Sequence, residues 1–176
     1  MLIRALLITT ALILIGPAIA QENAPSPSEK AAPAEVTDPA QFASIASVSN
    51  MFEIESSKLA QEKASSDEVK AFAEQMIADH TKAGEDMTRA ATEEGVAPAT
   101  ELDQQHQEIM DNLSSLSGEE FDTAYIQAQV QAHDEAVALF DGYSSNGQDG
   151  ALKQFAAATL PTLEEHQAHA HELAGH

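Results

Sequence analysis

The sequence predicts an all-α protein, an antiparallel bundle of four long helices with an extra short helix in the connection between the second and the third. Apolar residues recur at spacings of three and four along every long segment, which is the period of an amphipathic helix. No segment alternates apolar and polar residues with the period of two that a half-buried strand requires. The 176 residues include only eight Gly and seven Pro, and this length suits a single domain.

The first 20 residues are predicted to be an export signal. Arg4 gives a basic start, and the apolar run 5–16 is shorter than the ~20 residues that span a bilayer as a helix. Residues 18–20 read Ala-Ile-Ala, the A-x-A pattern of a cleavage site. Because the chain also lacks cysteine, we expect a periplasmic protein that is cleaved after Ala20 and folds without disulfides. An uncleaved N-terminal anchor is the alternative.

Residues 21–37 are expected to form a disordered linker. Three prolines and many small residues leave few bulky apolar side chains that could join a core. The bundle domain is expected at 38–174. It begins where Asp38 precedes Pro39, the pattern of an N-cap followed by proline at the first helical position.

The four long helices are expected at about 39–64, 66–94, 118–144 and 150–173, and the short helix at about 101–116. Two S-x-x-E patterns, Ser65 to Glu68 and Ser117 to Glu120, predict capping boxes at helix starts. Pro161 falls inside the last helix and is expected to kink it, since proline removes a backbone hydrogen bond.

The connection between the second and third long helices is much longer than the other two. It extends from Gly95 to Ser117 and contains the short helix. A long crossover connection of this kind is the arrangement expected of ferritin-like bundles. A plain up-down bundle is the alternative.

Composition excludes several classes of function. The formal net charge is -21, from 29 acidic against 8 basic residues, which argues against nucleic-acid binding and against docking on anionic lipid. The absence of cysteine rules out thiol catalysis and zinc bound by cysteine. No stretch within 21–176 is apolar enough for a transmembrane segment.

Histidines occupy positions on the helical seams where apolar residues belong. His80 lies at nearly the same helical angle as Val69 and Met87, and His106, His133 and His166 interrupt their own seams in the same way. Burying an imidazole costs free energy unless it is hydrogen-bonded or bound to a metal. When each helix is reflected about its turn, four side chains fall near one level at mid-bundle: Glu53, His80, His133 and His166.

This mixture of imidazole and carboxylate predicts a site for zinc, copper or iron. Asp79, Asp134 and Glu165 neighbour the histidines in sequence and are the expected hydrogen-bond partners behind the ligands. The alternative is a buried polar network in which each histidine bonds a carboxylate. The Glu-x-x-His pairs of di-iron bundles are absent, so a metal-dependent redox enzyme is disfavoured and the sequence favours a non-enzymatic protein.

The C-terminal segment 164–176 is a second candidate metal site, because it contains four of the seven histidines. Tracts rich in histidine can capture divalent metals. A solvated helix end is the favoured interpretation, since histidines there complement the helix dipole.

The chain also resembles a bacterial family, the domain of unknown function numbered 4142, over about residues 39–174. The resemblance rests on these stretches: Phe52-Glu53-Ile54 with Leu59-Ala60, Val69 to Ala73, Met76-Ile77-Ala78-Asp79-His80-Thr81, Gly118 with Phe121-Asp122 and Tyr125, His133-Asp134 with Val137 to Phe140, and Leu152-Lys153, Phe155-Ala156 and Leu160-Pro161-Thr162-Leu163 before Glu165-His166. It implies an exported ferritin-like helical bundle and no particular reaction. Two functions remain open, an envelope protein that binds a metal and an envelope protein that binds a protein partner. The sequence does not give the oligomeric state.

Overall fold

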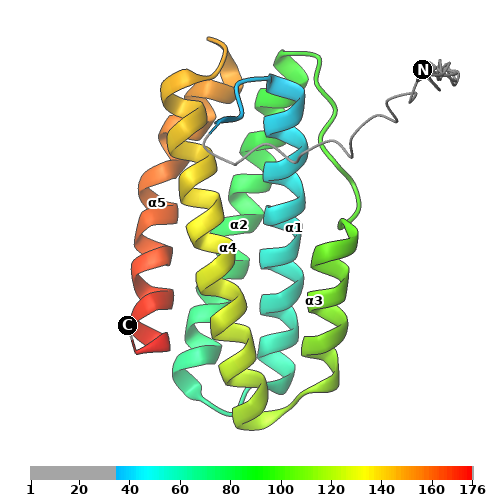
Figure 1. Ribbon diagram of the computed structural model, residues 1–176, viewed down its shortest axis with the longest axis vertical. Coiled ribbons are helices and arrows are strands. Elements are labelled where there is room, and N and C mark those ends of the chain that lie inside the picture. Colours follow the sequence, from blue (N-terminus) through cyan, green and yellow to red (C-terminus); the bar gives the residue numbers. More distant parts are fainter. Residues whose placement is uncertain (1–34, 176) are drawn as a thin grey trace, which may run out of the picture. The chain divides into compact units, whose positions relative to one another are not determined.

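The computed structural model describes residues 35–175. The expected signal peptide at 1–20 and most of the expected linker lie outside the described residues. Five helices and no strand occur within 35–175, which confirms the all-α prediction. The helices are α1 (Pro39–Lys63), α2 (Asp67–Glu93), α3 (Gln104–Ser115), α4 (Gly118–Asn146) and α5 (Ala151–Ala174), as Figure 1 shows.

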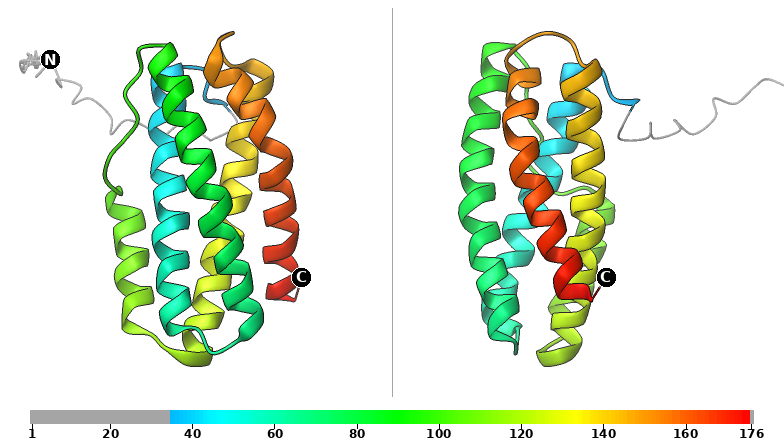
Figure 2. Two further views of the ribbon diagram at one scale, coloured as in Figure 1. Left: turned by 180° about the vertical axis from the view of Figure 1, so that it is seen from behind. Right: turned by 90° about the vertical axis from the view of Figure 1, so that its left-hand side faces the viewer.

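The four long helices pack around one core. Each long helix contacts two others, in the cyclic order α1, α2, α5, α4, and neighbours in this cycle run antiparallel (Figures 1 and 2). After α2 the chain returns along the bundle through a loop and then α3, which packs against α1 and also contacts α4. As a result α2 and α4 point in the same direction, as in the crossover connection that the sequence analysis expected.

Local capping explains where the first helices begin. The Asp38 side chain accepts a hydrogen bond from the backbone N–H of Gln41 at 2.8 Å, and Pro39 occupies the first turn. The N-cap of α2 is Ser66, which accepts from the backbone N–H of Val69 at 3.4 Å. The predicted cap, Ser65, has a different role, described below.

Two further helix starts depend on distant residues or on glycine. At α4 the predicted capping box is not formed, because Ser117 makes no side-chain cap bond and the helix begins at Gly118 with a φ of 63°. At α5 the N-cap is Gly150, which has no side chain, and Glu94 accepts a hydrogen bond from the backbone N–H of Leu152 at 2.7 Å. The helix α5 continues through Pro161 without interruption.

The apolar core consists of two clusters, one toward each end of the bundle. The first contains Phe42, Phe140, Tyr143 and Phe155, and also Val36, which precedes α1. The second contains Phe72, Met76, Leu113, Phe121 and Tyr125. On α1, α2, α4 and α5 alike, buried polar residues separate the two clusters along the chain. Among the described residues, no helix is both long and apolar enough to cross a membrane.

Candidate metal centre

A layer of buried polar side chains crosses the core between the two apolar clusters. All four long helices contribute to it, and its members are Glu53, Ser56, Ser57, His80, Gln129, His133 and His166, each at most 5% exposed. Burial of so many polar groups in one layer costs free energy unless they are bonded to one another or to a ligand. Polar atoms of this layer that have no hydrogen-bond partner in the protein are therefore the ones that could bind a ligand.

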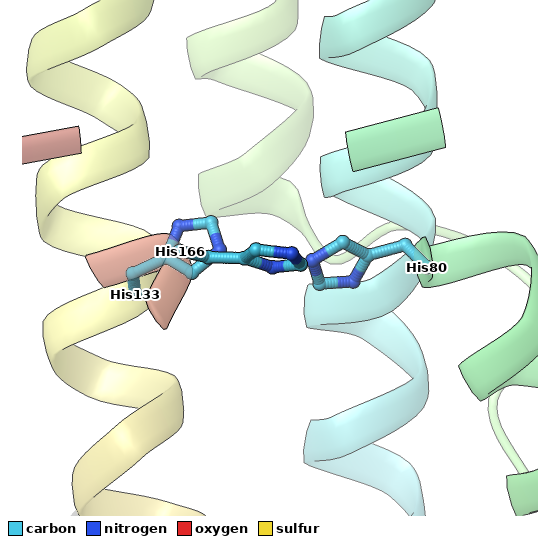
Figure 3. Close-up of side chains that lie close together, drawn as sticks. All are labelled: His80, His133 and His166. Carbon is cyan, nitrogen blue, oxygen red and sulfur yellow. The ribbon is translucent and has the colours of Figure 1, made fainter. Parts of the chain in front are cut away.

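Three imidazole rings meet at the centre of this layer. His80 comes from α2, His133 from α4 and His166 from α5, and their side chains point toward one another in Figure 3. The ring centroids form a nearly equilateral triangle with sides of 5.7, 5.5 and 5.5 Å. One potential ligand atom from each ring lies within 4.8 Å of the other two. We call these three residues the histidine triad.

One nitrogen of each triad ring is bonded to a protein oxygen outside the triad. The three pairs are His80 Nδ1 with Asn50 Oδ1 at 3.2 Å, His133 Nδ1 with the backbone oxygen of Gln129 at 2.9 Å, and His166 Nε2 with Asp79 Oδ2 at 3.0 Å. Each of these oxygens accepts, so each of these ring nitrogens must donate its hydrogen. That assignment fixes the tautomer of a neutral ring and leaves a lone pair on its other nitrogen.

The remaining nitrogens of the triad are His80 Nε2, His133 Nε2 and His166 Nδ1. All three are buried and have no hydrogen-bond partner. An unpaired buried acceptor is rare and costly in a folded protein, and three at one place in the core call for a common explanation. Three oriented rings, each with a free lone pair, are a set of groups that could hold a metal ion.

Burial keeps the triad neutral near pH 7. The pKa of His80 is lowered well below its usual 6.5, first by burial and then by His133 and His166. Burial also lowers the pKa of His133 to about 4, against an opposing effect of its bond to the backbone of Gln129. The pKa of His166 is lowered by burial, and its bond to Asp79 opposes the shift. Only neutral imidazole ligates a metal, so these shifts favour ligation.

Glu53, the fourth ligand predicted from the sequence, lies beside the triad and not within it. Its Oε1 is 3.9 Å from His133 Nδ1, the nitrogen that already bonds Gln129. Both carboxyl oxygens of Glu53 are buried without a hydrogen-bond partner. Burial raises its pKa to about 8, while the nearby side chain of Gln129 opposes the shift.

The three acids expected behind the ligands differ in position. Asp79 bonds His166, as described above. Asp134 instead bonds two residues on the surface of α5, Gln167 at 2.7 Å and His171 at 2.9 Å. Glu165 is exposed and acts on His166 only through its charge.

Sequence reasoning missed the other two partners of the triad. Asn50 acts on His80 from a different helix, which no spacing within one helix reveals. Gln129 contributes its backbone oxygen, so its side chain gave no signal, although it precedes His133 by four residues. That interval of one helical turn was the available clue.

The other histidines do not form a second site within the described residues. His106 bonds Asp103 on α3 at 2.6 Å, and its ring contacts Phe52. In the C-terminal segment His169 packs edge-on against Phe72, and His171 bonds Asp134. The last histidine, 176, lies outside the described residues. Over 35–175 the triad is the only group of three potential ligands that converges.

Comparison with known proteins places the chain in a family. Residues 24–173 match the sequence model of a family described as Domain of unknown function (DUF4142). The chain belongs to this family. The match begins further toward the N-terminus than the predicted resemblance, which covered about 39–174. It confirms the family that the motifs indicated. No significant match was found among curated proteins.

A solved structure supports the helical fold of this DUF4142 protein. A candidate secreted protein of DUF305 from Streptomyces coelicolor, known from a crystal structure, superimposes with a TM-score of 0.63. The two chains are 17% identical, and the similarity covers 75% of this chain and 87% of the other. At this level of identity the likeness concerns the fold.

Proposed function

We propose that this DUF4142 protein is an exported helical bundle that binds one divalent transition-metal ion on His80, His133 and His166. Two observations carry the proposal. His80, His133 and His166 each offer one ring nitrogen within 4.8 Å of the other two, and each ring has one buried nitrogen without a hydrogen-bond partner. Each ring is already oriented by a hydrogen bond on its far side. Metal-binding histidines are typically held in this way, by a carbonyl or carboxylate on the second nitrogen.

The distances allow such a site with small movements. A zinc–nitrogen bond is about 2.0–2.1 Å long, so ligand atoms that lie within 4.8 Å of one another must approach by roughly an ångström to share one ion. A change of that size is comparable to a small rotation of the rings about their side-chain bonds.

Zinc, copper and iron are the metals that suit the site. Imidazole nitrogen binds all three, and Cu²⁺ is expected to bind more tightly than Zn²⁺ or Fe²⁺. The three histidines carry no charge, so the ion brings a buried positive charge into the core. Glu53, whose carboxyl lies beside His133, and Asp79, which bonds His166, are the acids placed to balance that charge.

Export is the second part of the proposal. The sequence supports it through the apolar run at 5–16 and the A-x-A pattern that ends at Ala20. The structurally similar protein from Streptomyces coelicolor is itself described as a candidate secreted protein. We expect a periplasmic protein whose mature chain begins at Gln21, and N-terminal sequencing of protein recovered from the periplasm tests this directly.

Elemental analysis tests the metal site. The exported protein, purified untagged and without nickel resin, is dialysed with Zn²⁺, Cu²⁺ or Fe²⁺ in turn and measured by plasma mass spectrometry. We expect about one ion per chain and its loss in the His80→Ala/His133→Ala double variant. His169→Ala/His171→Ala is the matched control, because it removes two histidines outside the triad, and it should retain the ion.

A structural bundle without metal is the competing function. It is favoured by the fact that every triad ring already has one hydrogen bond to the protein. Absence of stoichiometric metal under all three conditions would support it and would overturn our proposal. Metal that persists in the double variant and disappears in the control would assign binding to the C-terminal histidines.

A further inference from the structure

A small cavity adjoins the histidine triad on the side of the apolar cluster that contains Phe42. Its volume is about 20 Å³, and it is lined by His80 together with three other polar residues, Ser49, Asn50 and Thr159, and by apolar side chains. A space of this size accommodates one water molecule, and a buried water requires two to four polar partners. The cavity provides both.

Helix geometry places this cavity about one helical turn from the level of the triad. Among its lining residues, Ala83 follows His80 by three positions, Ala136 follows His133 by three, and Leu163 precedes His166 by three. Because α5 runs antiparallel to α2 and α4, all three steps lead one turn in the same direction along the bundle. The cavity therefore lies next to the triad along the bundle, and His80 is the triad residue that lines it.

The cavity also borders a groove on the surface. The groove runs between α2 and α5 and has a volume of about 470 Å³. Ala83, Phe155 and Thr159 line both the groove and the cavity, so these three side chains are the wall between them. Asp79, which bonds the triad residue His166, lies in the same groove.

We infer that the cavity holds the fourth ligand of the bound metal, a water molecule that a diatomic ligand such as cyanide can replace. The inference rests on the proposed metal site. Three histidines leave one position of a tetrahedral ion open, and metal sites that react with small molecules keep such a position. Glu53 does not fill it, because its carboxyl lies beside Nδ1 of His133 and not beside the unpartnered nitrogen. The incoming ligand passes from the groove between Ala83, Phe155 and Thr159.

Cobalt and cyanide provide the test. The mature protein is loaded with one equivalent of Co²⁺, whose visible ligand-field bands report its coordination, and is titrated with cyanide while the cobalt content is measured before and after. We expect a saturable change of the bands with one cyanide per cobalt and no loss of cobalt. Bands that do not change although cobalt is bound would overturn this inference and leave the proposed function standing. Failure to bind cobalt at all would overturn both.

Two substitutions locate the ligand. Ala83→Leu fills the cavity and should weaken cyanide binding by about tenfold or more, because the leucine takes the space of the water and of the cyanide that replaces it. The cobalt content should stay at one per chain, while the bands before titration should change because the water ligand is lost. Ala158→Leu is the matched control, because Ala158 lines the groove but not the cavity, and it should bind cyanide as the parent protein does. Thr159→Leu adds volume to the same wall from α5. It is the variant to use if Ala83→Leu fails to fold. Equal cyanide affinity in the parent and both cavity variants would overturn the inference.

Discussion

At the scale of single residues, the triad depends on the partners that hold its rings. Asn50 bonds His80 from α1, and it reaches that position because Gly84 has no side chain. A Cβ at position 84 would lie 2.8 Å from Nδ2 of Asn50, which is closer than the two atoms can approach. Gly84 therefore leaves room for the Asn50 side chain, although glycine within a helix lowers the stability of the helix.

Gly84→Ala should lower metal affinity without lowering stability. The added methyl group displaces the flexible Asn50 side chain from His80, and loss of such a partner typically weakens metal binding by about tenfold or more. Alanine also favours the helix by up to about 1 kcal/mol relative to glycine. Competition with a chelator measures the affinity and urea unfolding the stability. In an Asn50→Ala background the same substitution should have no further effect on affinity, and an additional loss there would contradict the explanation.

The metal-free protein should be most stable near pH 6.5. Below that pH the triad histidines, whose pKa values are lowered in the native state, bind protons more readily in the unfolded chain, so stability falls as pH falls. Glu53 has the opposite effect on the pH dependence of stability, because its pKa rises from 4.5 to about 8 on folding. The native state keeps a proton that the unfolded chain has lost, and stability therefore falls as pH rises toward 8.

Urea unfolding of Glu53→Gln at several pH values checks the assignment to this carboxyl. Glutamine keeps the size of the side chain and cannot ionise, so the decline in the free energy of unfolding between pH 6.5 and 8 should flatten. The acidic side of the curve, which belongs to the histidines, should keep its slope. An unchanged decline in this variant would show that another group causes it.

At the scale of elements, residues far away in the sequence cap several of the helix ends. Asp122 on α4 accepts hydrogen bonds from the backbone N–H groups of Ser65 and Ser66 and from the Ser65 hydroxyl, at the start of α2. Lys63 at the end of α1 donates to the backbone oxygens of Ser114 and Leu116 at the end of α3. These contacts satisfy backbone groups that a helix leaves unpaired at its ends. They also fix how neighbouring helices meet.

Asp122→Ala should destabilise the bundle by about 1–3 kcal/mol. The substitution leaves the N–H groups of Ser65 and Ser66 without their charged acceptor, and bonds to charged groups are the stronger ones. The free energy of urea unfolding measures the effect. Asp149→Ala is the matched control, because Asp149 is almost fully exposed and pairs with Lys153, and exposed ion pairs of this kind contribute little to stability. Similar effects in both variants would argue against a specific cap.

At the scale of the whole bundle, the polar layer divides the apolar core in two. The triad brings together side chains from α2, α4 and α5, and a bound ion would connect these three helices. The unfolded chain cannot bring the three side chains together without cost. Binding of an ion at the triad would therefore be coupled to folding.

Zn²⁺ should raise the free energy of unfolding of the whole bundle by about 2.7 kcal/mol at a free concentration 100 times the dissociation constant. Urea unfolding with and without zinc measures this difference. Mg²⁺ should have no comparable effect, because it prefers oxygen ligands. In His133→Ala the zinc effect should disappear, and an undiminished effect there would place the stabilising ion elsewhere.

The sequence determined the helical class, the helix limits to within a few residues and the histidines of interest. Helical period is a local property, and a polar residue on an apolar seam is visible without any partner. The tertiary structure decided which of the candidates meet. It brought His80, His133 and His166 together, placed Glu53 beside them and moved His106 to a separate contact on α3. Whether side chains on different helices face one another depends on the rotation and tilt of each helix and on the side-chain rotamers. The spacing of residues along one helix does not contain this information.

The same distinction explains the caps and the partners of the triad. Ser65 and Ser117 have the sequence of capping boxes. Ser65 instead donates hydrogen bonds to Asp122, and Gly118 begins the helix that follows Ser117. Asn50 and Gly84 gave no signal, since their role exists only where α1 meets α2. A local pattern specifies what a segment can form by itself. The choice among such options falls to contacts between segments, because burial and hydrogen bonding across helices outweigh the fraction of a kcal/mol by which local preferences differ.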